Sequence, residues 1–219
     1  MKASIREALW FHLLFFIVSA PVLFLVHGAM LGKALVGLTL FYNLALPMMG
    51  LMRGHGEWLR LWLFLLPLSC GQVMPDWALA EIAGVLVFPD HGIWRVGGQV
   101  PAYFMGLWIM LLFPITLISD SLRSRYLAAA SLGLLLFTFW EWAARPLQLW
   151  HAQDVWTIAG TAVYPLIPEM LLVIATLAAY RNSREHNIIQ QWFSAFGVNL
   201  LYTGAVFIGL LLTRRLHQG

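Results

Sequence analysis

Apolar stretches of membrane-spanning length occupy most of this 219-residue chain and constrain its fold more than any other feature. A bilayer core about 30 Å thick requires roughly 20 apolar residues per helix. Seven stretches approach this length, and we expect each to form a span: 9–26, 31–52, 58–73, 101–119, 126–144, 159–180 and 188–213. The predicted fold is therefore all-α, a polytopic transmembrane helical bundle with seven spans, or six spans and a re-entrant helix. We expect one integral membrane domain covering residues 1–219.

Composition excludes a water-soluble domain. Hydrophobic residues make up 61% of the chain and charged residues 11%, and the mean hydropathy is +0.78, whereas about 25% of a soluble domain is charged. Cys70 is the single cysteine, which excludes a disulfide within the chain and a multi-cysteine metal site. The partners we expect are the lipid bilayer and a lipophilic small molecule, and no nucleic acid.

The distribution of charged residues predicts an orientation. Lys and Arg in short loops collect on the cytoplasmic side of a membrane. With the N-terminus in the cytoplasm of a bacterium and the chain in the inner membrane, most basic residues share that side: Lys2, Arg6, Arg53, Arg60, Arg123, Arg125, Arg181 and Arg184. Arg214 and Arg215 fall on the other side, against the rule. Six acids also fall there and could line one pocket: Asp76, Glu81, Asp90, Glu141, Asp154 and Glu169.

The stretch 74–104, MPDWALAEIAGVLVFPDHGIWRVGGQVPAYF, is the most polar part of an otherwise apolar sequence. Its ionisable residues are Asp76, Glu81, Asp90, His91 and Arg95. An ionisable group at membrane depth is costly unless it is paired or hydrated, so such a cluster indicates a functional site. Residues 77–87 are expected to form a short helix that cannot cross the bilayer. The alternative is that the stretch is only a folded connector.

Glu141 is the most informative acid because it lies inside a predicted span, between Trp140 and Trp142. Arg145 follows four residues later on the same helical face, so one interpretation is a structural salt bridge. The other is that Glu141 donates or relays a proton, held by Arg145 or kept protonated by its apolar surroundings. Glu169 follows Pro168 in a helix that two prolines disturb. It either lines a cavity or caps the new helix N-terminus.

Aromatic residues crowd the acids: Trp140, Trp142, Trp150 and Trp156. Aromatic ring faces stabilise cationic character by roughly 1–2 kcal/mol where water is excluded, so acids among tryptophans suit carbocation chemistry or a polyene ligand. The pairs Asp90–His91 and His151–Asp154 have spacings that only weakly indicate a metal, and no histidine-box or aspartate-rich array exists. We expect no metal and no cofactor.

Two resemblances can be stated. The runs LFYNLALPMMGLMRGHGEWLRLWLFLLPLSCGQVMPDWALAE, FPDHGIWRVGGQVPAYFMGLWIMLLFP, FWEWAARPLQLW and AVYPLIPEMLL resemble a family of small bacterial integral-membrane proteins of uncharacterised function, over most of the chain. More loosely, a compact bundle with intramembrane acids and many aromatics is similar to membrane terpene cyclases and small lycopene cyclases. That resemblance implies protonation of an alkene or epoxide by a carboxylic acid without metal. The paired-glutamate motif of the lycopene type is missing here, so no catalytic residue is transferred.

Together these features predict a membrane enzyme that cyclises or isomerises an isoprenoid or another lipophilic substrate by proton transfer. The candidate acids and bases are Asp76, Glu81, Asp90, Glu141 and Glu169. The candidate substrate-binding residues are His91, Arg95, Trp140, Trp142, Arg145, Trp150, Asp154 and Trp156. The alternatives are a proton-coupled transporter or channel using the same carboxylates, and a lipid- or pigment-binding accessory protein.

Overall fold

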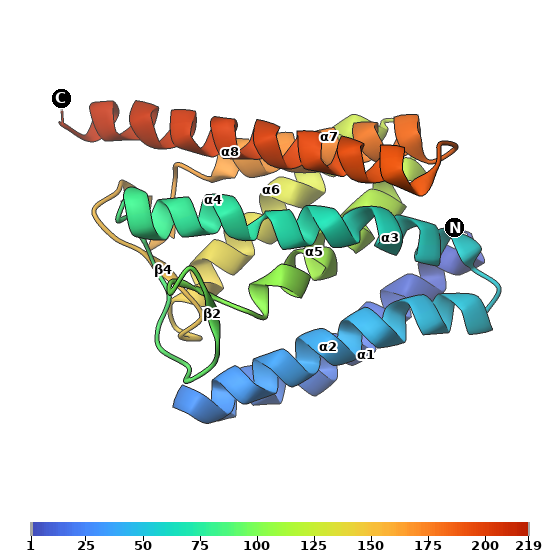
Figure 1. Ribbon diagram of the computed structural model, residues 1–219, viewed down its shortest axis with the longest axis horizontal. Coiled ribbons are helices and arrows are strands. Elements are labelled where there is room, and N and C mark those ends of the chain that lie inside the picture. Colours follow the sequence, from blue (N-terminus) through green and yellow to red (C-terminus); the bar gives the residue numbers. More distant parts are fainter. Residues whose placement is uncertain (1, 219) are drawn as a thin grey trace.

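The computed structural model describes residues 2–218 as a bundle of long helices with three short antiparallel strand pairs (Figure 1). The helices are α1 (Ala3–Leu25), α2 (Gly28–Met52), α3 (Gly56–Gly71), α4 (Val73–Trp77), a π-helical turn (Ala78–Ile82), α5 (Phe104–Asp120), α6 (Arg125–Ala144), α7 (Leu166–Ser183) and α8 (Ile188–Gln218). Met1, Gly219 and the side chain of Arg215, which the predictions above include, lie outside the described part.

Five helical segments of the described chain are long and apolar enough to cross a membrane: α1, α2, the continuous segment Gly56–Ile82, α6 and Ile188–Arg214 of α8. Helix α5 is apolar but has only 17 residues. Large apolar side chains such as Leu25, Leu127 and Phe193 are exposed on the outer faces of these helices. Such surfaces are stable in hydrocarbon and not in water, so the fold is that of a helical membrane protein.

Helix α3 packs against α5 and α8, α7 packs against α8, α6 and α5, and the α1–α2 hairpin lies along one side. Close approach of two of these helices depends on Gly133 of α6. A Cβ atom at this position would clash with the side chain of Val173 on α7. Small residues permit such close helix contacts in membranes, where apolar burial does not drive association.

One end of the bundle, which we call the basic end, holds the N-terminal start of α1 and the α2–α3, α5–α6 and α7–α8 turns. Glu7 accepts hydrogen bonds there from Arg53 Nε at 2.8 Å and His55 Nε2 at 3.2 Å. Asp120 pairs with Arg181 and, at 3.4 Å, with Arg184. These contacts join α1 to the α2–α3 turn, and α5 to α7.

The opposite end, which we call the capped end, is covered by segments 83–103 and 145–165 (Figure 1). Their strands pair as β1 (Leu86–Val87) with β4 (His151–Ala152), β2 (Arg95–Val96) with β3 (Val100–Pro101), and β5 (Thr157–Ile158) with β6 (Thr161–Ala162). In the first pair Leu86 lies opposite Ala152 and Val87 opposite His151. The two capping segments are thus joined to each other.

The predicted separate helix 77–87 is wrong. Residues 56–82 form one continuous helix, which Pro75 interrupts only by removing one backbone donor. Gln72 and Ala78, which flank α4, keep right-handed helical backbone angles. The helix then widens into a π-helical turn, in which Ala83 N donates to Ala78 O at 3.0 Å. Asp76 therefore lies inside a membrane helix and not at the start of a new one.

The predicted start of the sixth span at residue 159 is also wrong, because α7 begins at Leu166. Residues 157–162 form a tight hairpin whose two central residues, Ala159 and Gly160, have φ of 50° and 82°. Two consecutive residues with positive φ match the twist of a two-residue hairpin turn. This apolar segment therefore forms a hairpin in the cap and is not part of a span.

Candidate functional site

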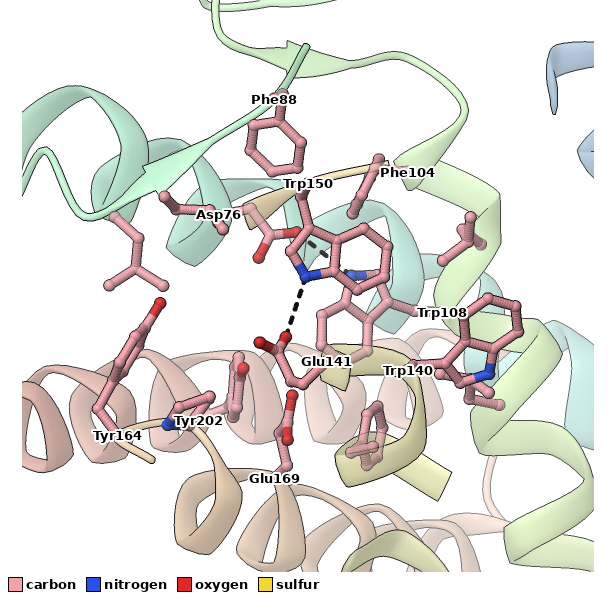
Figure 2. Close-up of a pocket in the computed structure, with 16 residues that line it drawn as sticks. Asp76, Phe88, Phe104, Trp108, Trp140, Glu141, Trp150, Tyr164, Glu169 and Tyr202 are labelled. Atoms are coloured by element: carbon pink, nitrogen blue, oxygen red, sulfur yellow. Dashed lines mark hydrogen bonds between the residues drawn. The ribbon is translucent and has the colours of Figure 1, made fainter. Parts of the chain in front are cut away.

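Three carboxyl groups converge on one cavity beneath the capping segments (Figure 2). Asp76 comes from α4, Glu141 from the last turn of α6 and Glu169 from the first turn of α7. The exposed fractions of Asp76 and Glu169 are 5% and 3%. Figure 2 shows the three carboxyl groups directed into a common space, although they are 28 or more residues apart in the sequence.

Local structure explains how each acid reaches this space. Pro146 follows α6, and the chain then turns back through Gln148, whose φ is 56°. This turn brings the indole of Trp150 over the end of α6, where its Nε1 donates a hydrogen bond to Glu141 Oε1 at 3.0 Å. Glu169 begins the regular hydrogen bonding of α7, its N donating to Pro165 O at 2.8 Å.

The hydrogen bonds to the three acids differ. Trp108 Nε1 donates to Asp76 Oδ2 at 3.3 Å, and Trp150 supports Glu141. Glu169 Oε2 is buried and has no hydrogen-bond partner among the described residues. Among the described residues that line the cavity there is no Lys, Arg or His. Three enclosed negative charges without a cation would repel one another strongly, so the group is suited to holding and moving protons.

The remaining walls are aromatic and apolar: Leu79, Leu86, Phe88, Phe104, Leu107, Trp108, Leu111, Phe137, Trp140, Trp150, Tyr164, Pro165 and Tyr202. The cavity leaves about 40 Å³ for the centres of water molecules. A single water requires roughly 10–15 Å³ on this measure. In this conformation the cavity therefore fits a few waters or a small part of a ligand.

A larger apolar pocket adjoins this cavity. It leaves about 340 Å³ on the same measure and lies between the α1–α2 hairpin and α5, α6 and the segment after α6. Four residues line both spaces: Leu107, Leu111, Trp140 and Trp150. Its main polar feature is His12, whose Nε2 lies 2.8 Å from the hydroxyl oxygen of Tyr42. The two tryptophans thus separate a hydrocarbon-lined pocket from the carboxyl groups.

Five of the predicted site residues line the carboxylate cavity: Asp76, Glu141, Glu169, Trp140 and Trp150. The other eight do not: His91 and Arg95 belong to the roof described below, and six lie elsewhere. The prediction that all six acids on this side share one pocket is wrong. Glu81 and Asp90 are exposed, and they accept hydrogen bonds from Gln99 and from the backbone of Gly92. The others point outward because they lie on the outer face of α6 or beyond its end: Trp142, Arg145, Asp154 and Trp156.

The predicted ion pair between Glu141 and Arg145 is absent from the described part of the chain. Arg145 is the first residue after α6, and its exposed side chain leaves the helical face that carries Glu141. The structural salt bridge that the i, i+4 spacing indicated therefore does not form. Glu141 is held instead by a neutral indole N–H.

His91 and Arg95 hold the roof of the cavity and do not line it. The Arg95 guanidinium donates to the carbonyl oxygens of Phe88 at 2.7 Å and Pro89 at 2.6 Å. His91 Nε2 donates to Gln148 O at 2.9 Å, and Nδ1 accepts from the Tyr103 hydroxyl at 3.2 Å. Burial lowers the pKa of the His91 imidazole. The neutral ring thereby joins the two capping segments.

Sequence reasoning missed the residues that complete the cavity, notably Trp108, Tyr164 and Tyr202. Tyr202 was detectable in principle, because it lies on the buried stripe of α8 with Val198 and Val206, where a tyrosine brings a hydroxyl into the membrane interior. Across the described chain, no group of three or more His, Cys, Asp or Glu side chains is arranged to hold a metal ion.

These features define a helical membrane protein with a buried carboxylate cavity. The chain belongs to the family described as a domain of unknown function (DUF6989), whose model matches residues 73–213. The matched region contains all the residues that line the carboxylate cavity, and it leaves out α1, α2 and α3. No curated protein and no solved structure matches the chain.

Proposed function

We propose that this protein is a membrane-embedded enzyme that isomerises or cyclises an isoprenoid or another lipophilic alkene by carboxylic-acid proton transfer, without metal or cofactor. The observation that carries the proposal is the convergence of three carboxyl groups on an aromatic cavity that shares its walls with an apolar pocket. Carboxyl groups enclosed together in such a cavity are typical of proton-transfer sites.

The chemistry balances without a redox partner. A protonated carboxyl group adds its proton to a carbon–carbon double bond, which leaves a carbocation on the adjacent carbon. Ring closure onto a second double bond can follow. A neighbouring carboxylate then removes a proton from the carbon next to the cation, and a new double bond forms. We assign the addition of the first proton to Glu141, and the removal of the second proton, from the carbon next to the cation, to Asp76 or Glu169.

The walls suit the intermediate that this route requires. Trp108, Trp140 and Trp150 line the cavity beside the acids. Indole faces stabilise a cation that is shielded from water by about 2 kcal/mol or more each. The three indole rings carry no hydroxyl or carboxylate that would trap the cation, and the cavity leaves room for only a few waters.

The apolar pocket is the proposed position of the substrate's hydrocarbon chain. Leu9 and Phe16 at its margin are exposed on the lipid-facing surface of α1, so a substrate can enter from the bilayer. Trp140 and Trp150 lie between this pocket and Glu141. The reactive double bond therefore reaches the acid when Trp150, which is carried on an irregular segment and not on a helix, moves aside.

The full topology is part of the proposal. We infer that all seven long helices cross the inner membrane of a bacterium and that the N-terminus is cytoplasmic. The gathering of Lys2, Arg53, Arg60, Arg181 and Arg184 at the basic end supports this orientation. Reporter fusions after Arg53, Arg123 and Arg184 should be cytoplasmic, and fusions near Gly92 and His151 external. The opposite pattern at both external sites would overturn the orientation.

The function is tested by lipid analysis followed by turnover. The protein is purified in nanodiscs, bound lipids are identified by mass spectrometry, and geranylgeraniol and squalene are offered as probes. We expect conversion to isomeric products of unchanged mass, reduced by 10² or more in Glu141→Gln. Glu81→Gln, in the exposed acid of the π-helical turn, is the matched control and should keep full activity. Equal turnover by wild type and Glu141→Gln would contradict the proposal.

A further inference from the structure

Six polar side chains are buried at successive depths between the carboxylate cavity and the basic end. We call them the polar row: Gln72, Asn199, Ser69, Thr116, Thr176 and Ser119. They come from the helices α3, α5, α7 and α8, or from the residue that ends α3. Ser, Thr, Asn and Gln at helix contacts in membranes usually hydrogen bond to a neighbouring helix, so the atoms of this row that lack a partner require an explanation.

Helix geometry places three of the hydroxyls at one depth. Ser69 is seven residues before Asp76, Thr176 is seven after Glu169, and Thr116 is eight after Trp108, which bonds Asp76. At 1.5 Å per residue, each lies about 10–12 Å from the carboxylates toward the basic end. Helix α5 packs against both α3 and α7. The three hydroxyls thus form one level of the interior.

A second level lies between this one and the acids. Gln72 is four residues before Asp76, and its Nε2 donates to Asn199 Oδ1 at 2.8 Å. Asn199 in turn lies three residues from Tyr202, which lines the carboxylate cavity. The amide pair therefore lies about 5–6 Å from the acids, on the side toward the basic end.

The row ends near charged groups at the basic end. Ser119 precedes Asp120, and Tyr180 lies on α7 four residues beyond Thr176. Both Asp120 and Tyr180 line a polar pocket with Lys2 and Arg60, which leaves about 340 Å³ for water. The row thus begins at enclosed carboxyl groups and ends at a pocket lined by charged residues.

The row is buried but incompletely hydrogen bonded. Ser69, Ser119 and Thr176 are 0% exposed and Thr116 is 1% exposed. Their hydroxyl oxygens and Gln72 Oε1 have no hydrogen-bond partner among the described residues, and neither has Glu169 Oε2 at the head of the row. An isolated polar atom in the membrane interior is unfavourable, so such groups indicate a path or a site and not packing.

We propose that the polar row is a proton path that connects the three carboxyl groups with the basic end. Each hydroxyl or intervening water accepts one proton and passes on another, so no bond is changed overall. The path lets the cavity exchange protons with one side of the membrane while the capped end stays closed. It goes beyond the proposed function, because it supplies protons whatever chemistry the acids perform.

Infrared spectroscopy tests the path without substrate. Wild-type protein in nanodiscs is mixed with D₂O, and the downshift of the carboxylic C=O band, assigned with Glu141→Gln and Glu169→Gln, is followed in time. Thr116→Val/Thr176→Val should slow the exchange at least tenfold. Its melting temperature should stay unchanged, because neither hydroxyl has a partner to lose. The matched control is Thr161→Val, which replaces a buried threonine at the capped end. This variant should exchange deuterium at the wild-type rate.

Exchange of the double variant at the wild-type rate would overturn the path, as would slowing by Thr161→Val alone, which indicates entry through the cap. Absence of any exchangeable carboxylic band in wild type would overturn it as well. If the double variant does not fold, Ser69→Ala is measured in its place, with the same expectation. If the double variant exchanges deuterium slowly but the wild type turns over no probe, the path is supported and the proposed function is contradicted. The two proposals can therefore fail separately.

Discussion

Replacing Glu141 with Gln should separate the catalytic role of this side chain from its structural role. The Gln side chain keeps a carbonyl oxygen where Trp150 Nε1 now donates at 3.0 Å. The change converts a hydrogen bond to a charged or titrating group into a neutral one, which costs about 1 kcal/mol. For a chain of this size that corresponds to a decrease in melting temperature of about 2–4 °C. Proton transfer should fall by about 10²–10⁴.

A structural salt bridge makes a different prediction. Breaking a buried Glu141–Arg145 pair would cost about 3–5 kcal/mol, and Arg145→Met in the same chain would restore much of it. Because Arg145 is exposed and makes no such pair, we expect the two substitutions to be additive. The assay is thermal unfolding of both single variants and the double variant in nanodiscs, beside turnover. A large loss of stability that Arg145→Met relieves would refute our interpretation of this acid.

Two further predictions concern the roof and the packing. Burial holds the pKa of His91 below its ordinary value of 6.5, so the unfolded chain binds the proton more readily. The contribution of the neutral ring to stability is complete above pH 6.5 and is lost as the pH falls below it. The melting temperature of wild type should therefore fall more steeply between pH 7.5 and 5 than that of His91→Gln; parallel curves would contradict this. Gly133→Val should destabilise by about 1–3 kcal/mol, measured by thermal unfolding, because its side chain meets Val173 on α7. Gly197→Val on α8, where a Cβ atom meets nothing within 4 Å, is the control.

The helices were largely predictable from the sequence, because apolar length alone identifies a span. The predicted end of the fifth span at Ala144 and start of the last at Ile188 agree with α6 and α8. Pro75 and the stretch around Ala159 were misassigned. At Pro75 the helix continues with the loss of one backbone donor, and around Ala159 a two-residue turn with positive φ replaces the helix that the apolar composition predicted.

The composition of the site was only partly predictable. Glu141 and Glu169 were identified because an acid inside a span is unusual, and both line the cavity. Glu81 and Asp90 were indistinguishable from Asp76 by sequence, since all three lie in one polar stretch. Their separation depends on helix phase, which turns Asp76 inward and Glu81 outward across the π-helical turn. That turn has no sequence signature strong enough to predict it.

The most direct test of the central claim is the position of deuterium in the product. Wild-type protein is equilibrated in D₂O and given the lipid that it co-purifies with, or geranylgeraniol if none is found, and the product is analysed by mass spectrometry and NMR. If a carboxyl group donates a proton to a double bond, one carbon-bound deuterium appears at the protonated carbon in each turnover. Glu141→Gln should form this labelled product at least 10² more slowly. Product formed without carbon-bound deuterium would contradict proton transfer from the carboxylate cavity.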